Sequence, residues 1–158
     1  MMKKTIILMG VFLLLFNSNC KKGTQEETAL EMAPLVGVEI DTKRIEDTTR
    51  VKFKVLKTEA IGYMPLHKFY WISLEEKANS QQLENLANAI IREIISLKPN
   101  TYHSFKIHIF LESALKESVE GSEPFAQATY LPEGSWLMVG RIPIDGYESY
   151  VLSCTIQE

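Results

Sequence analysis

The pattern that most constrains the fold is an amphipathic stretch between about Ser80 and Leu97. Apolar residues recur there at the three- and four-residue spacing of an α-helix, which places them along one stripe. Asn79 or Ser80 is positioned to cap the start, and Pro99-Asn100 ends the stretch. The stripe consists of Leu83, Leu86, Ala87, Ile90, Ile94 and Leu97, widened by Ile91 and Ile95. The pattern predicts one principal helix that covers one face of a sheet.

Two strand-like segments flank this helix. Residues 68–74 are rich in aromatic and β-branched side chains, and residues 104–111 alternate apolar with polar ones. A strand, a helix and a second strand in this order predict a right-handed crossover between parallel strands. The alternation directs Phe105 and Ile107 toward the core and leaves His108 on the opposite face.

The remainder of the body contains further strand signals separated by turns. Residues 113–124 are polar and loop-like, and Pro132-Glu133-Gly134 is typical of a hairpin turn. Further strands are expected at Val51–Leu56, Phe125–Leu131, Ser135–Ile142 and Tyr147–Ile156. Together these signals predict an α+β domain with a single mixed five- or six-stranded sheet and the helix at about 80–97 packed on one face.

The first twenty residues have the organisation of an export signal. Lys3 and Lys4 precede an apolar run from Ile6 to Phe16, and a polar stretch follows. As a helix this run covers about 16 Å, roughly half of the hydrocarbon thickness that a spanning segment crosses. A basic start, a short apolar centre and a polar exit favour a cleaved signal peptide over residues 1–19.

The cysteine that closes this segment carries a resemblance. Asn17-Ser18-Asn19-Cys20 resembles the lipobox of bacterial lipoprotein precursors. It matches only relaxed versions of that motif, since the usual lipobox has an aliphatic residue at the position of Asn17 and Gly or Ala at the position of Asn19. The resemblance implies diacylglycerol on the Cys20 sulfur and cleavage just before it. It also implies attachment to the bacterial cell envelope, at an outer membrane, a periplasmic face or the cell surface. A soluble exported protein and an uncleaved short anchor are the alternatives.

The segment after the leader has the composition of a linker. Residues 20–49 include the lipidation candidate, many charged residues, Pro34 and Gly37, so we expect a flexible tether. Within it, Leu35–Ile40 is a candidate for a short added strand. Residues 50–158 then remain for one globular domain, which is long enough to bury a single core.

The chain contains two cysteines. Exported proteins can form disulfides, so a bridge between Cys20 and Cys154 competes with lipidation of Cys20. In the expected last strand, Cys154 shares a face with Leu152 and Ile156. This placement predicts a small buried hydrophobe rather than a reactive thiol.

The charge of the body argues against nucleic-acid binding. The full chain has a formal charge of −3, and without the two leader lysines 15 basic residues face 20 acidic ones. Nucleic-acid-binding domains usually have a basic footprint, which this composition does not provide. We therefore expect a membrane and an envelope protein, rather than a nucleic acid, as partners.

Catalytic candidates are few. The three histidines are His67, His103 and His108, and none has helical metal-ligand spacing or an acidic cluster beside it. His108 and Glu112 share a strand face with Lys106, and this pattern predicts a solvated polar stripe. The alternative is a catalytic or ligand-binding site formed by His108, Glu112 and His103. No metal, cofactor or nucleophile motif is expected.

Aromatic residues provide the remaining hint. Tyrosine and tryptophan are favoured at binding surfaces and equally in sheets. The candidates for a recognition patch are Tyr63, Tyr70, Tyr102, Tyr130, Trp136, Tyr147 and Tyr150. The segment Phe125–Pro132 resembles a strand motif of uncharacterised small bacterial α+β domains, and this resemblance implies no activity.

Two functional hypotheses follow. The first is a non-enzymatic, membrane-anchored lipoprotein that binds an envelope protein through a sheet edge or a loop surface. The second is a small hydrolase or ligand carrier with a site near His108 and Glu112. A pocket bordered by the histidines would favour the second, and a filled core with an exposed aromatic surface would favour the first.

Overall fold

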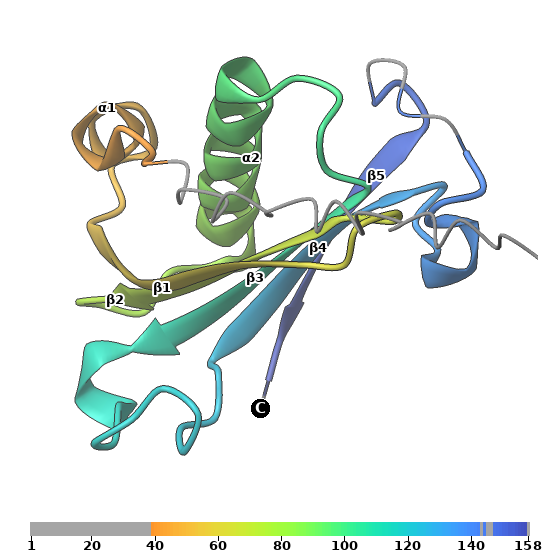
Figure 1. Ribbon diagram of the computed structural model, residues 1–158. Helices are drawn as coiled ribbons and strands as arrows, with labels where there is room; N and C mark the ends of the chain where they lie inside the picture. The colour runs from red at the N-terminus through yellow and green to blue at the C-terminus, as the bar shows by residue number, and fades with distance from the viewer. Residues whose placement is uncertain (1–38, 143, 145–146, 158) are drawn as a thin grey trace, which may run out of the picture. The chain divides into compact units, whose positions relative to one another are not determined.

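The protein has an α+β fold built on a single mixed sheet (Figure 1). The computed structural model describes residues 39–142, 144 and 147–157. The five strands are β1 (Phe53–Ile61), β2 (His67–Leu74), β3 (Ser104–Leu111), β4 (Ala126–Pro132) and β5 (Tyr150–Ile156). The α-helices are α1 (Thr42–Thr49) and α2 (Ser80–Leu97), and the 3-10 helices are η1 (Glu112–Ala114) and η2 (Trp136–Met138). The predicted fold class is confirmed.

The strands lie side by side in chain order. Among these five strands only the β2–β3 pair is parallel, with α2 between the two strands in the chain, as the strand-helix-strand pattern predicts. The other three neighbouring pairs are antiparallel. Because β2 and β3 run in the same direction, His67 lies beside Ser104 and Trp71 lies beside His108.

Helix α2 begins and ends where the sequence indicates. The Asn79 side chain accepts a hydrogen bond from the backbone N–H of Gln82, and the Gln82 side chain accepts one from the N–H of Asn79. This reciprocal capping box satisfies two backbone donors that a helix start leaves open. The predicted apolar stripe is buried from Leu83 to Ile94, whereas Leu97 is exposed at the end of the helix.

The core lies between the helices and one face of the sheet, the inner face. Alternate residues of the two parallel strands, such as Ile72 and Ile109, are buried there against the α2 stripe. At one end of this layer Tyr102, Phe105 and Tyr147 pack edge to face or tilted, with ring centroids 5.7 to 5.9 Å apart. The opposite face, the outer face, has no α-helix over it in the described part of the chain (Figure 1).

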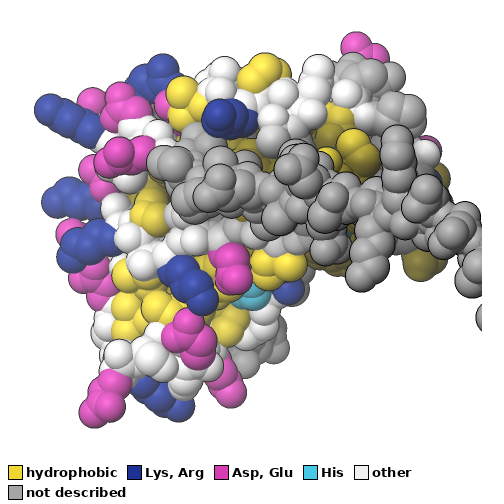
Figure 2. Space-filling model, in the orientation of Figure 1, with side chains coloured by type: hydrophobic (Ala, Val, Ile, Leu, Met, Phe, Trp, Pro, Cys, Tyr) yellow, Lys and Arg dark blue, Asp and Glu magenta, His cyan; other side chains and the backbone are white. Residues whose placement is uncertain are grey.

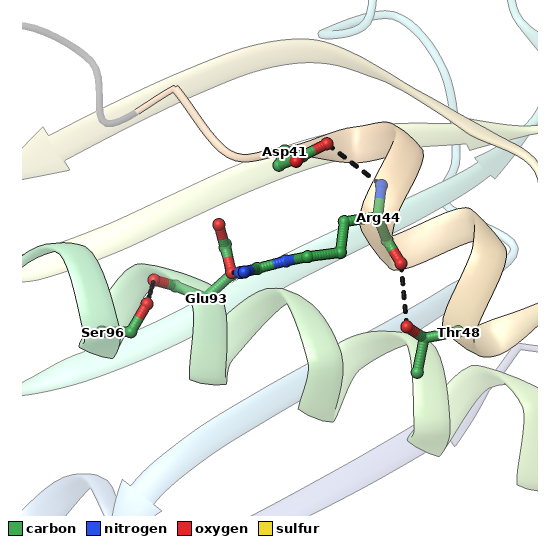
Figure 3. Close-up of polar contacts among 5 residues, drawn as sticks. All are labelled: Asp41, Arg44, Thr48, Glu93 and Ser96. Carbon is green, nitrogen blue, oxygen red and sulfur yellow. Dashed lines mark hydrogen bonds and ion pairs between the residues drawn. The ribbon is translucent and has the colours of Figure 1, made fainter.

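The expected tether includes a helix, which corrects its boundary. Residues 42–49 form α1, which the Asp41 side chain caps by accepting the N–H of Arg44 at 3.0 Å. Its single apolar residue, Ile45, is buried. The Arg44 guanidinium forms an ion pair with Glu93 of α2 (Figure 3). Residues 42–49 therefore belong to the folded unit, because these contacts supply what an isolated eight-residue helix lacks.

One strand prediction is wrong, and another can be compared with the structure only in part. Residues 135–142 contain η2 and turns instead of a strand, because β5 occupies the edge of β4, where Leu131 pairs with Val151. Of the expected strand Leu35–Ile40, residues 39 and 40 form no strand, and the rest lies outside the described residues. The predicted signal peptide, residues 1–19, and Cys20 lie outside them as well.

Candidate functional site

The outer face contains a row of rings at its centre. Strand alternation directs Phe69 and Trp71 of β2 to this face, and parallel pairing sets His108 beside Trp71. The Trp71 and His108 rings are stacked, with centroids 5.3 Å apart and an interplanar angle of 10°. Phe69 stacks on Trp71 at 5.9 Å, and His67 continues the series 6.5 Å from Phe69. We call His67, Phe69, Trp71 and His108 the aromatic row.

The residues of this row are partly exposed, and their rings cover one another in part. The His108 ring stacks on Trp71, and the Lys57 ammonium lies 5.0 Å from the Trp71 ring centroid. A flat ligand such as a base or a sugar therefore has little free surface on the Trp71 ring on which to stack. The row offers instead an apolar ridge for side-chain packing.

Charged side chains border the ridge on the side of β1. Lys54 pairs with Glu112 at 2.7 Å, and Lys57 pairs with Glu120 at 3.1 Å and with Glu59 at 3.7 Å. The pairs with Glu112 and Glu120 connect β1 to the segment after β3, which lies on the side of the sheet away from the helices (Figure 1). Figure 2 shows hydrophobic side chains gathered on the lower part of the molecule, beside a histidine and between lysines and acids.

His108 is held in its neutral form. Burial, and secondarily the charge of Lys106, lower the pKa of His108 from 6.5 to about 4. Its neighbour on the same face, Phe110, is only 3% exposed. The predicted solvated face is therefore wrong at Phe110, which is buried, whereas Lys106 and His108 are partly exposed.

A pH-dependent stability follows from this burial. Between pH 6.5 and 4 the unfolded chain binds a proton at His108 that the folded chain does not, so stability falls as the pH falls through this range. We expect a loss of about 1 to 2 kcal/mol, after discounting for solvent screening of a partly exposed ring. Urea unfolding at several pH values measures it. A His108→Gln variant should retain only a smaller loss of stability at low pH, which is due to His67 and His103, because burial also lowers the pKa values of these two residues. A pKa near 6.5 for the His108 imidazole, measured by NMR in the folded protein, would contradict this prediction.

The three catalytic candidates do not pair with one another in the described part of the chain, and each has another partner. Glu112 binds Lys54 and accepts a hydrogen bond from the Ser73 hydroxyl at 3.4 Å. The Nδ1 atom of His103 accepts the backbone N–H of Leu66 at 3.0 Å, at the opposite end of β3 from Glu112. His108 stacks on Trp71 instead of pairing with Glu112. The arrangement provides neither a general base with an orienting acid nor an open nucleophile.

A histidine–serine contact appears where sequence reasoning found none. The Nδ1 atom of His67 lies 2.7 Å from the Ser104 hydroxyl, because parallel pairing sets the two residues side by side. Ser104 is only 1% exposed, so its hydroxyl cannot reach a substrate. Only the register of β2 and β3, which a single sequence does not reveal, could have indicated this pair. The pair connects the ends of two strands and serves structure.

The predicted aromatic recognition patch divides into two groups. Tyr70, Tyr102 and Tyr147 are buried, and the backbone N–H of Tyr102 donates to the Tyr147 hydroxyl at 3.4 Å. Tyr130 and Tyr150 pack against this group with centroids 5.2 Å apart, so these five tyrosines belong to the core side. Tyr63 and Trp136 are exposed, in loops. The prediction of one patch is wrong, because strand alternation sends most of its members inward.

The remaining candidates for chemistry are limited among the described residues. No group of three or more His, Cys, Asp and Glu side chains there is placed to hold a metal ion.

A cleft of about 240 Å³ near the start of α2 is lined by residues that include Arg50, Lys52, Glu75 and Lys77, whose charges have both signs. Cys154 is partly buried on the inner face, and burial raises the pKa of its thiol, so the side chain behaves as the predicted apolar residue.

Comparison with known proteins gives no parallel for this arrangement. No protein family, curated protein or solved structure matches the chain. Among the described residues, the helices are too short or too polar to cross a membrane. Evidence on function therefore comes from the described surfaces and from the sequence of residues 1–20.

Proposed function

We propose that this protein is an exported lipoprotein of the bacterial cell envelope, which is anchored by acyl chains on Cys20 and binds an envelope protein through its outer face. The observation that carries the binding role is the aromatic row, a partly exposed apolar ridge on a sheet face over which no α-helix lies among the described residues. Protein interfaces characteristically combine an aromatic centre with a polar, charged rim. Here Lys54, Lys57, Lys106 and Glu59 supply that rim.

The anchoring role is supported by the leader. A basic start, a short apolar run and Cys20 in a relaxed lipobox together favour acylation at this cysteine. Two or more acyl chains hold a protein stably on a bilayer, whereas one holds it marginally. The segment between the cysteine and Glu39 then lets the folded unit meet partners at some distance from its anchor.

Binding is favoured over catalysis by the state of the candidate groups. Ser104 is buried, Glu112 is paired with Lys54, and His108 is stacked on Trp71. Nucleophilic catalysis needs an accessible nucleophile in contact with a base, and these contacts do not provide one. The same ring stacking that removes His108 from acid–base work builds the ridge that a partner can cover.

Site-specific photocrosslinking in cells tests the binding surface. A photoreactive phenylalanine analogue at Phe69, on the outer face, is expected to give a discrete adduct with an envelope protein. The matched control places the analogue at Gln81, on the exposed side of α2. The adduct from Phe69 should be lost in Trp71→Ala and in Lys106→Glu, and retained in Asn85→Ala, one turn beyond Gln81 on the same exposed side. Equal adducts from both positions, or none from Phe69, would overturn the proposed surface.

Mass spectrometry of the mature amino terminus tests the anchor separately. The expected terminus is an acylated Cys20, and Cys20→Ser should abolish both acylation and removal of the leader. A native protein that retains residues 1–19, or that has an unmodified thiol at Cys20, would contradict the lipoprotein assignment. Purified protein with a substrate turnover that His108→Ala abolishes, at unchanged melting temperature, would instead support a hydrolase.

A further inference from the structure

Exposed apolar side chains gather at one end of the sheet. Of the seven large hydrophobic residues that are exposed in the described part of the chain, five lie at the end of β1, in the loop that follows it and in the loop that contains η2, and these five are between 47% and 80% exposed. They are Ile61 (48%), Tyr63 (73%), Met64 (80%), Trp136 (47%) and Leu137 (74%), and we call them the apolar tip. Single exposed hydrophobic residues are ordinary, whereas a group of them marks an interaction site.

The two loops of the tip are in contact. The first connects β1 to β2, and the second contains η2 after β4. A Cβ atom added to Gly140 would lie 3.4 Å from three ring atoms of Pro65, so the second loop lies closely against the first. The Trp136 ring also lies 6.0 Å from His67, the first residue of β2. The two loops that display these side chains are therefore packed together at this end of the sheet.

The backbone of the first loop is held by its glycine. Gly62 has a φ of +91°, and a Cβ atom there would lie 2.3 Å from the Pro65 carbonyl oxygen. No other residue type fits this close approach. The turn consequently projects Tyr63 and Met64 into solvent in a defined direction, which a binding element needs.

The parts of the two loops that display these side chains contain no charged residue. Residues 61–66 read Ile-Gly-Tyr-Met-Pro-Leu, and residues 135–140 read Ser-Trp-Leu-Met-Val-Gly. Charges begin just outside them, with Glu133 before the second loop and Arg141 after it. The apolar tip therefore consists of two uncharged segments with charged residues just beyond them.

The chemistry of the tip suits a lipid surface better than a protein groove. High exposure of Tyr63, Met64 and Leu137 means that the tip is convex, so it enters a partner rather than receiving one. Tryptophan and tyrosine are favoured at the boundary between lipid headgroups and acyl chains, because each combines an apolar ring with a polar group. Methionine and leucine beside them would reach the acyl region without burying a charge.

The bilayer is also within reach of the tip if the proposed function is right. Glu39, the first described residue, follows Cys20 by nineteen positions in the sequence. A segment of that length spans at most about 65 Å even when fully extended. An acyl anchor at Cys20 would therefore keep the folded unit close to the membrane at high local concentration.

We infer that the apolar tip inserts into the headgroup region of the bilayer to which Cys20 is anchored, and so orients the folded unit on the membrane. This inference rests on the proposed function for the anchor. Its occupant is a lipid surface. A protein pocket that covers the same side chains is one of the outcomes that the test distinguishes.

The two tryptophans of the chain allow a direct test. In the full, acylated protein with Trp71→Phe, Trp136 is the sole tryptophan. On phosphatidylcholine vesicles its emission should shift to the blue, and lipids brominated on the acyl chains should quench about half of it, as expected for a ring at interfacial depth. The inference is overturned if the Trp136 emission stays at the wavelength of a water-exposed tryptophan and is not quenched by brominated lipid. It is also overturned if the emission shifts to the blue without being quenched. If Trp71→Phe does not fold, the difference between the wild type and Trp136→Phe gives the same reading.

Variants show whether the loops themselves insert. Leu137→Ser and Met64→Ser should each reduce quenching of Trp136 by brominated lipid, whereas Val119→Ser, in the segment after β3, should not. Equal quenching in all three variants contradicts insertion of the tip. Mass spectrometry separates the two proposals. An unacylated Cys20 refutes the anchor, whereas an acylated Cys20 with an unquenched Trp136 refutes the tip alone.

Discussion

An Ile72→Ala substitution is expected to lower the free energy of unfolding by about 3 to 4 kcal/mol. Ile72 is completely buried in β2, and its neighbours across the strands are Val55 of β1 and Ile109 of β3. The change removes apolar contacts and leaves a cavity that the central strands cannot close. Urea unfolding followed by circular dichroism measures the loss.

The matched control is the same substitution at the end of the neighbouring strand. Ile61 is the last residue of β1 and is 48% exposed, so Ile61→Ala should cost less than about 0.5 kcal/mol. Equal losses in the two variants would mean that the core does not lie between the inner face and α2. The Ile61 variant also tests the tip, because its fold should persist while lipid contact weakens.

The second large effect is expected at the contact between the two helices. Arg44→Ala should reduce stability by about 2 kcal/mol, because it leaves the Glu93 carboxylate in place without its cation. The two partners differ in exposure, since the Arg44 side chain is 63% exposed and Glu93 only 8%. We expect a loss below the usual range for buried pairs for this reason, because water screens the arginine side of the pair.

A double-mutant cycle separates the ion pair from other effects. Glu93→Gln in the Arg44→Ala background should recover much of the loss, because no unpaired charge then remains against the helix (Figure 3). Native-state hydrogen exchange should show faster exchange in α1 than in α2 of the single variant. Unchanged exchange in α1 would show that Ile45, rather than the ion pair, holds the helix in place.

Residues 42–49 form a helix, although the sequence predicts a flexible tether there, and this difference has a physical explanation. The segment reads Thr-Lys-Arg-Ile-Glu-Asp-Thr-Thr, with one apolar side chain, so it provides no stripe that predicts a helix. Its stability comes from contacts outside itself, namely the Ile45 side chain in the core and Arg44 on α2. A capping residue, Asp41, was present in the sequence and could have indicated the start of a helix.

The outer face illustrates a second limit. Alternation in residues 104–111 correctly assigned Lys106 and His108 to one face of a strand. It did not reveal that Trp71 would lie beside His108, because this depends on the parallel register of two strands about thirty residues apart. The row of rings, and with it the candidate surface, is a product of that register.

The sequence alone determined the α+β class, the position of α2, its cap and the two strands that flank it. These features arise from local periodicity and from capping chemistry, which act over a few residues and can be detected in a single chain. Tertiary structure decided which strand occupies the edge of β4, where α1 docks, which rings stack on the outer face and which loops meet at the apolar tip. Each of these depends on residues that are distant along the chain, and a local pattern shows which way a side chain points without showing what will lie beside it.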